Sequence, residues 1–288
     1  MDYIIHILIL FSIYAILSLS LNLVVGYTGL LSVTQAAFYG IGAYTTAILT
    51  SHLGFNFFIS VILGIFITSI SGFLIGLVLS KFRGDYYALA TLGFNVIIFG
   101  IFVNWDSLTN GPLGIPGVFK PNLFSISLAH NFPFLVLSLV FLGVVFWICH
   151  FISKSSFGRV LKAIREDEFA LQIFGYKVSS FKLSIFVISA AIAAIAGSLF
   201  ASYLTFVDPS TFTLLESIFI LSIIILGGLG NLRGSMLGAL IMVLLPEILR
   251  FVGMPDEIAA QMRQLIYGII LILLMLFKPQ GLIGEYKL

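Results

Sequence analysis

The residues of this sequence that could do acid–base chemistry lie together in one window. Between Lys154 and Lys182 the chain holds nine of its 26 charged residues, with an acidic run at 166–168. Carboxylates act as general acids and bases when a histidine or a nucleophile faces them. His150 precedes the window, but nothing else in the sequence supports a reaction. A membrane-embedded enzyme is therefore the weakest of three interpretations, and we expect no catalytic residue.

Motifs for phosphate or metal binding are absent from the sequence. There is no G-x-x-x-x-G-K-[ST] loop for nucleotide phosphates and no H-E-x-x-H. The four histidines lack ligand spacing, and the single cysteine, Cys149, lies inside an apolar run. We expect no metal and no cofactor, so any ATP that drives this protein must be used by a partner.

The composition is that of a membrane protein. Hydrophobic residues make up 60% of the chain and charged residues 9%, with a mean hydropathy of +1.17, whereas soluble domains are about 45–50% apolar. The formal net charge of +2 gives no reason to expect a nucleic-acid partner. We therefore expect most of this chain to lie within a lipid bilayer.

Apolar runs long enough to cross the bilayer recur along the whole chain. About 20 helical residues span the hydrocarbon core, and nine runs qualify: 3–25, 30–50, 57–80, 86–105, 132–153, 183–205, 214–230, 234–252 and 262–278. The second and seventh carry glycines near one end and could be broken or re-entrant, so the total is eight to ten. The prediction is an all-α, polytopic helical bundle forming a single transmembrane domain over 1–288.

Basic residues predict the orientation. If the charged loop 154–182 is cytoplasmic, alternation places 11 of the 14 Lys and Arg on that side, as the positive-inside rule requires. The carboxyl terminus is then cytoplasmic and the loop 106–131 external. Nine spans put the amino terminus outside and ten put it inside, and the sequence leaves that choice open.

The charged window cannot lie in lipid. Nine charges at about 2.5–3.5 kcal/mol each would cost on the order of 25 kcal/mol there, so this segment lies in water or on a partner. Its pattern predicts one helix ending at Gly175. The face predicted to rest on the protein holds Val160, Ala163, Ile164, Leu171 and Phe174. Phe169 and Ile173 project instead from the charged face. Such a pair suits a groove on another protein, and a membrane-surface helix is the alternative.

The polar groups expected inside the membrane are small and neutral. They are Asn22, Ser32, Gln35, Thr91 and Asn95. Three acidic or basic side chains, Glu216, Glu247 and Arg250, fall near span ends, where we expect them to reach the interface. Carriers driven by protons or sodium usually need such groups at mid-membrane, so the energy for transport is expected to come from elsewhere.

A glycine-flanked segment is the best candidate for the path of a solute. GYTGLL at 26–31 weakly repeats in GGLGNL at 227–232, and transporter repeats often place broken helices around the path. The predicted path residues are Tyr27, Ser32, Gln35, Thr91 and Asn95. Neutral dipoles of this kind are compatible with a zwitterionic solute.

Four stretches together carry a family resemblance. They are GYTGLLSVTQAAFYGIGAY at 26–44, GDYYALATLGF at 84–94 followed by LTNGPLGIPG, GRVLKAIREDEFALQIFGYKVSSFKL at 158–183, and DPSTFTLLESIFILSIIILGGLGNLRGSMLGA at 208–239. In order and spacing the chain resembles the M-type (LivM-like) permease subunit of bacterial ABC importers for branched-chain amino acids. The resemblance covers nearly the whole chain.

The resemblance implies a fold like that of type II ABC importers and a multi-pass location in the bacterial cytoplasmic membrane. It implies a complex with a second, homologous permease, two ATPase subunits and an external substrate-binding protein. The solute would be a branched-chain amino acid or a related small polar molecule such as urea or a short amide. A stand-alone secondary carrier or channel is the alternative function.

The resemblance also implies a cytoplasmic helix that docks on an ATPase. Its residues here would be Arg159, Ala163, Arg165, Glu166, Asp167, Glu168, Phe169, Ala170, Ile173 and Gly175. The sequence departs from the family pattern at Thr34, where glycine is more common, and at Phe169, where a small residue is. The spacing of the E-A-A-x-x-x-G signature is also poorly matched, which affects the expected docking geometry.

Overall fold

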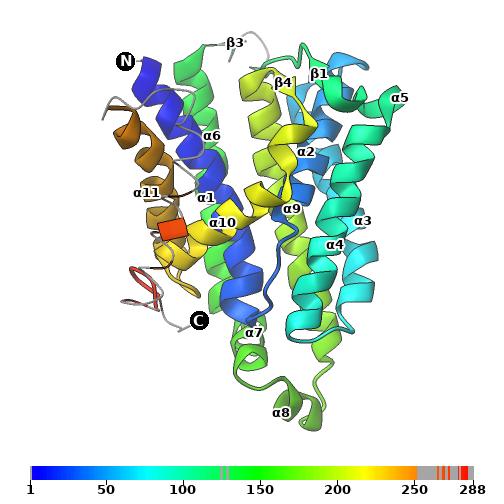
Figure 1. Ribbon diagram of the computed structural model, residues 1–288, viewed down its shortest axis with the longest axis vertical. Helices are drawn as coiled ribbons and strands as arrows, with labels where there is room; N and C mark the ends of the chain where they lie inside the picture. The colour runs from blue at the N-terminus through cyan, green and yellow to red at the C-terminus, as the bar shows by residue number, and fades with distance from the viewer. Residues whose placement is uncertain are drawn as a thin grey trace.

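The computed structural model describes residues 2–123, 126–127, 130–251, 265, 268–269, 272, 278 and 280–284. It confirms the all-α bundle (Figure 1). Its long helices are α1 (Asp2–Thr28), α2 (Gln35–Ser51), α3 (Phe57–Leu79), α4 (Asp85–Asn104), α6 (Asn131–Lys154), α9 (Val178–Leu204), α10 (Leu214–Gly227) and α11 (Leu232–Phe251). The shorter elements are α5 (Asp106–Thr109), η1 (Gly111–Leu113), β1 (Ile115–Pro116), β2 (Asn122–Leu123), β3 (Ile126–Ser127), α7 (Ser156–Glu166), α8 (Glu168–Ile173), β4 (Phe206–Val207) and η2 (Pro209–Phe212).

Eight of the nine predicted spans correspond to these long helices. Five of them, α1, α3, α4, α6 and α9, are long and apolar enough to cross a membrane. The two uncertain spans are short: α2 has 17 residues and begins only at Gln35, and α10 has 14. The ninth predicted span, 262–278, lies largely outside the described residues.

Helices α1 and α9 form the centre of the bundle. Most of the large buried side chains belong to them and to α2, whereas α3, α4 and α6 expose apolar faces. Small residues allow α2 and α9 to pack closely. A Cβ added to Gly42 would lie 2.5 Å from Ala194 Cα, and one added to Gly197 would lie 2.1 Å from the Tyr39 carbonyl. Larger side chains at these two glycines would separate the helices.

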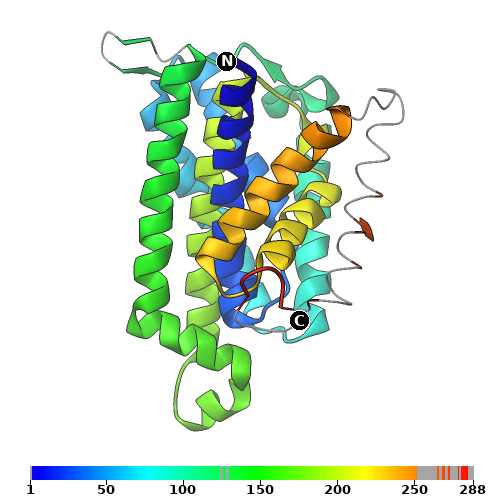
Figure 2. The same ribbon diagram turned by 90° about the vertical axis from the view of Figure 1, so that its left-hand side faces the viewer.

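The amino terminus and the charged window lie at opposite ends of the molecule. Figure 1 shows the start of α1 at one end and α7 and α8 beyond the other, and Figure 2 confirms this from the side. Of the two topologies that the sequence left open, this arrangement favours the one with the amino terminus opposite the charged loop. The turn between α3 and α4, with Lys81 and Arg83, lies at the charged end.

The loop 106–131 forms part of the opposite end. Its strand β1 pairs antiparallel with β4, with Ile115 opposite Val207, and the Gly117 N–H donates to the Thr205 carbonyl at 3.0 Å. This segment is therefore joined to the end of α9 by backbone hydrogen bonds and does more than connect α4 to α6.

Candidate functional site

The second predicted span, 30–50, is helical only from Gln35 onward, and we call the non-helical residues 29–34 before it the broken segment. Helix α1 ends at Thr28, residues 29–34 are not helical, and α2 begins at Gln35. Gly29 has φ +70°, a conformation that other residues rarely adopt, and a Cβ there would lie 3.0 Å from Arg165 Cγ. Non-helical backbone at membrane depth must find hydrogen-bond partners in the protein.

Polar side chains of α4 and α10 supply these partners. Asn95 Nδ2 donates to the Val33 carbonyl at 2.9 Å and to Ser217 Oγ at 2.7 Å. The Val33 N–H donates to Thr91 Oγ1 at 3.3 Å, and the Ala36 N–H donates to Ser217 Oγ at 2.9 Å. We call the hydrogen-bonded side chains around residues 29–36 the polar network; its members are Ser20, Ser32, Thr34, Gln35, Thr91, Asn95, Ser189 and Ser217. They fix the broken segment between α4 and α10.

The remaining contacts of the broken segment run toward α1 and α9. Gln35 Nε2 donates to Ser20 Oγ at 2.6 Å, and Ser20 in turn donates to the Ser189 carbonyl at 2.7 Å. Ser32 and Thr34 share a hydrogen bond of 3.0 Å between their hydroxyl oxygens. Thr34, a departure from the family pattern, thus contributes a hydrogen bond that glycine could not make.

Four of the five predicted path residues belong to the polar network. Ser32, Gln35, Thr91 and Asn95 meet around the broken segment, and each is at most 1% exposed. Tyr27 lies at the end of α1 and faces α7, where Lys162 Nζ is 5.5 Å from its ring centroid. That these side chains line a solute path stays a prediction.

Sequence reasoning missed the serines of the polar network. Ser20, Ser189 and Ser217 lie in apolar runs and are fully buried or nearly so. No periodicity distinguishes them from other small polar residues in membrane helices, so only their contacts identify them. Within the described part of the chain, Asn95 Oδ1 is a buried acceptor without a hydrogen-bond partner.

The two similar glycine-containing segments, 26–31 and 227–232, are in contact with each other. Asn22 Oδ1 accepts a hydrogen bond of 3.0 Å from the Gly230 N–H, and Asn22 Nδ2 donates to Ser235 Oγ at 2.6 Å. A Cβ on Gly26 would lie 2.6 Å from Gly230 N. Asn22 therefore joins the end of α1 to the turn between α10 and α11, and the internal repeat itself stays a prediction.

The prediction that Glu216 reaches the interface is wrong. Tyr14 Oη donates to Glu216 Oε1 at 2.8 Å, and Tyr14 lies midway along α1. The reason is that η2 precedes the short α10, so α10 begins inside the bundle rather than at its end (Figure 1). Glu247 does lie at an end, where it accepts a hydrogen bond from Tyr3. The side chain of Arg250 lies outside the described residues.

The charged window forms two helices, not the single helix predicted. Asp167 is extended, with φ −154°, and separates α7 from α8. Its carboxylate accepts hydrogen bonds from the Phe169 and Ala170 N–H groups at 2.9 and 3.0 Å. Asp167 is thus the N-cap of α8, which explains why the helix breaks there. Both views show α8 projecting beyond the bundle (Figures 1 and 2).

Helix α7 rests on the protein and α8 does not. Leu161 and Ile164 of α7 are buried, whereas α8 has no buried residue. Phe169 is 64% exposed and Ile173 is 86% exposed, as predicted. Phe174 was expected on the covered face but is 78% exposed, because α8 ends at Ile173 and Gly175, with φ +84°, turns the chain. Phe169, Ile173 and Phe174 form what we call the α8 patch.

Ion pairs hold α8 in place. Glu168 lies 2.5 Å from Lys182 Nζ and 3.3 Å from Arg83 Nε, and the Lys182 side chain is only 1% exposed. The Arg83 guanidinium also lies over the Phe169 ring, 4.4 Å from its centroid, and donates to Gln172 Oε1 at 3.1 Å. These contacts join α8 to the start of α9 and to the turn between α3 and α4.

Arg165 is not the surface charge that the helix pattern indicated. Its guanidinium donates to the Gly26 carbonyl and, at 3.4 Å, to the Val25 carbonyl. These are among the last carbonyls of α1, which a cation at a helix carboxyl end satisfies. Arg165 therefore ties α7 to the end of α1, next to Gly29 and the broken segment.

The other predicted coupling residues are distributed over both helices. Arg159, Glu166, Asp167 and Gly175 are exposed, and Ala163 and Ala170 are half-buried. Arg159 donates to Ser156 Oγ at 2.9 Å.

Comparison with known proteins decides the family. Residues 3–275 match the family described as the permease component of the branched-chain amino acid transport system. The chain belongs to this permease family. Members of the family are transport subunits and not enzymes, in agreement with the sequence-based expectation.

The chain is similar to several permeases from bacteria and an archaeon. The high-affinity branched-chain amino acid transport system permease protein LivM of Salmonella typhimurium is 35% identical over 295 residues, which cover 94% of this chain and 68% of the relative. The probable LivM of Methanocaldococcus jannaschii is 28% identical, covering 99% of this chain and 94% of the relative. LivH of Escherichia coli is 25% identical, covering 95% and 92%. No solved structure matches the chain.

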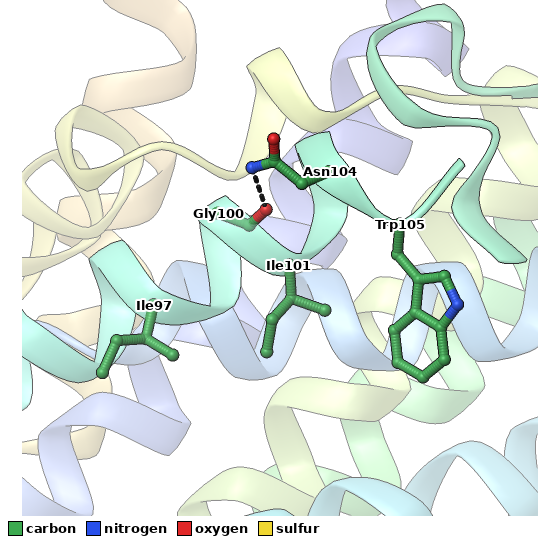
Figure 3. Close-up of a pocket in the computed structure, with 5 residues that line it drawn as sticks. All are labelled: Ile97, Gly100, Ile101, Asn104 and Trp105. Carbon is green, nitrogen blue, oxygen red and sulfur yellow. Dashed lines mark hydrogen bonds between the residues drawn. The ribbon is translucent and has the colours of Figure 1, made fainter. Parts of the chain in front are cut away.

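A hollow on the permease surface shares no lining residue with the polar network. It is lined by Ile97, Gly100, Ile101, Asn104 and Trp105 of the outer face of α4 and the residue that follows it (Figure 3). The Asn104 amide donates to the Gly100 carbonyl of its own helix at 2.7 Å. This hollow is wide and mostly apolar, so it offers a small polar solute little to bind.

Proposed function

We propose that this permease is a membrane subunit of an ATP-driven ABC importer, and that α8 docks on an ATPase subunit. The observation that carries the proposal is the α8 patch: three large apolar side chains, 64–86% exposed, outside the bundle and bordered by charged residues. An apolar pair four residues apart on a short helix fits a groove on another protein. A membrane-surface helix would not need the ion pairs that fix α8 to the start of α9 and to the turn between α3 and α4.

The proposed complex contains this chain, a second permease, two ATPases and an external binding protein. The relation to both LivM and LivH, which are each named as a permease protein of a high-affinity branched-chain amino acid transport system, supports a second homologous permease. The ATPases account for the lack of a phosphate-binding loop in this chain. The relatives' names support branched-chain amino acids as the solute, which would pass the broken segment and the polar network.

The proposed orientation places α7 and α8 in the cytoplasm of a bacterial cell. The carboxyl terminus is then cytoplasmic, and the amino terminus and loop 106–131 are external. The distribution of Lys and Arg supports this assignment. A cysteine placed at Ser180 should react only from the cytoplasmic side and one at Asn122 only from outside; the reverse pattern would overturn the orientation.

Reconstitution tests the proposal. The assembled complex in liposomes, supplied with a leucine-loaded binding protein, should take up leucine only when ATP is present on the ATPase side. The chain alone should take up none under a proton or sodium gradient. Uptake by the chain alone would instead support the stand-alone carrier or channel, and uptake of urea or a short amide in place of leucine would change the proposed solute.

A further inference from the structure

Glu216 is the one carboxylate of the described membrane helices that lies deep in the bundle. Asp2 and Asp85 occur in the first turns of α1 and α4, and Glu247 meets Tyr3 at the amino-terminal end of α1. Glu216 instead meets Tyr14, midway along α1. Ionisable side chains within a membrane are unfavourable, and those that persist there usually mark a solute or ion pathway.

The contacts of Glu216 leave much of its carboxylate unused. A carboxylate can accept about four hydrogen bonds, and the hydrogen bond from Tyr14 to Oε1 is the only one to its side chain among the described residues. Within the same part of the chain it makes no salt bridge. A purely structural role would require only the Tyr14 hydrogen bond, which an uncharged amide could also accept.

The position of Glu216 connects it to the polar network. Its neighbour Ser217 accepts hydrogen bonds from the Ala36 N–H and from Asn95 Nδ2, so α10 carries the carboxylate next to the broken segment. Glu216 is half-buried, and the flanking Leu215 and Ile218 are exposed. Figure 1 shows α10 on the front of the bundle, between α11 and α4.

We propose that Glu216 binds the ammonium group of the solute as it passes the broken segment. A protonated amine donates charge-assisted hydrogen bonds to a carboxylate, which are stronger than those between neutral groups. The inference rests on the proposed function and narrows it: a carboxylate at this depth serves an amino acid, whereas urea and short amides carry no cation for it to bind. Neutral dipoles alone, which the sequence offered, would then be insufficient.

Substitutions at Glu216 and Tyr14 separate binding from structure. In the reconstituted complex, Glu216→Gln should lower the maximal rate of ATP-dependent leucine uptake by about tenfold, because the amide cannot form an ion pair. Glu216→Asp should recover part of that rate because it restores the charge. Tyr14→Phe should lose less than Glu216→Gln, and the matched control Glu247→Gln at the bundle end should match the unmodified complex.

A structural role predicts the opposite order. Glutamine can still accept the Tyr14 hydrogen bond, so Tyr14→Phe would then be the more harmful change and Glu216→Asp would be no better than Glu216→Gln. Either that order or an unchanged rate for Glu216→Gln would overturn the inference. If the unmodified complex itself takes up no leucine, the proposed function fails instead. If Glu216→Gln does not assemble on gel filtration, the comparison of Glu216→Asp with Tyr14→Phe decides.

Discussion

The charged helices and the polar network differ in the kind of side chain that holds each of them in position. Helices α7 and α8 lie at the end of the bundle and are held by charged side chains, whereas the polar network lies inside the bundle and uses hydroxyl and amide groups. Both hold an irregular backbone in a defined position. The difference shows that most of the charged side chains lie where water can solvate them, with Lys182 and Glu216 as exceptions, and that neutral dipoles satisfy the backbone of the broken segment inside the bundle.

Arg165 joins the two regions. It extends from α7 to the last carbonyls of α1 and packs on Gly29, where the broken segment begins. Because α7 continues into α8 at Asp167, a displacement of the α8 patch has a short route to the broken segment. The comparison thus predicts that changes at Arg165 and in the α8 patch alter coupling, that changes in the ion pairs of α8 alter stability, and that changes in the network alter stability and transport together.

The largest effect on stability is expected at Glu168. Glu168→Gln would leave Lys182, which is 1% exposed, paired with a neutral amide. Losing one partner of a buried ion pair is strongly destabilising, and the partial exposure of Glu168 reduces the expected loss to about 2–3 kcal/mol. Hydrogen exchange of α8 and thermal unfolding should both report it.

Lys182→Met is the matched change. It removes the buried charge instead of isolating it, so it should be the milder of the two. If Lys182→Met proved more harmful than Glu168→Gln, the ion pair would not be what holds α8.

A smaller effect is expected in the polar network. Asn95→Leu would deprive the Val33 carbonyl and Ser217 of a donor, at about 1–3 kcal/mol for the unsatisfied buried groups. Leucine uptake should fall with it. The control is Asn104→Leu on the same helix, where an exposed amide donates to the Gly100 carbonyl of its own helix. Equal thermal stability of the two variants would contradict the role given to the network.

Arg165 should affect coupling more than stability. Arg165→Gln removes the guanidinium from the end of α1 but leaves a polar side chain there, so unfolding should shift by no more than about 1 kcal/mol. The number of leucine molecules taken up per ATP hydrolysed should fall several-fold. Exposed Arg159→Gln is the control. A normal ratio of uptake to hydrolysis in the Arg165 variant would show that the contact with Gly26 is not part of the coupling.

Features that depend on neighbouring residues could be predicted from the sequence, whereas features that depend on distant residues could not. The exposure of Phe169 and Ile173 follows from an i, i+4 spacing within one turn, and the break before Gln35 follows from adjacent glycines. The role of Ser217 could not be predicted, because its partners are separated from it by more than a hundred residues. The N-cap role of Asp167 could not be predicted either, because Asp167 lies in an acidic run whose members all look like surface charges in the sequence. The depth of Glu216 depends on how η2 enters the bundle.

Changes in the α8 patch should have the smallest effect on the stability of the bundle and the largest effect on binding of the ATPase. Phe169 and Ile173 are mostly exposed in this chain, although Arg83 covers one face of the Phe169 ring, and burial of each in an ATPase groove is worth about 1.5–3 kcal/mol. The double change Phe169→Ser with Ile173→Ser should therefore leave thermal unfolding of the permease unchanged while weakening its association with the ATPase.

The most direct test of the docking role is the rate of ATP hydrolysis by the reconstituted complex, measured with and without a leucine-loaded binding protein. In the complex that carries both serine substitutions, we predict that the loaded binding protein no longer stimulates hydrolysis. A control with Leu113→Ser, an exposed side chain at the opposite end of the molecule, should keep the stimulation. Full stimulation in the double variant would contradict the assignment of α8 as the helix that couples this permease to its ATPase.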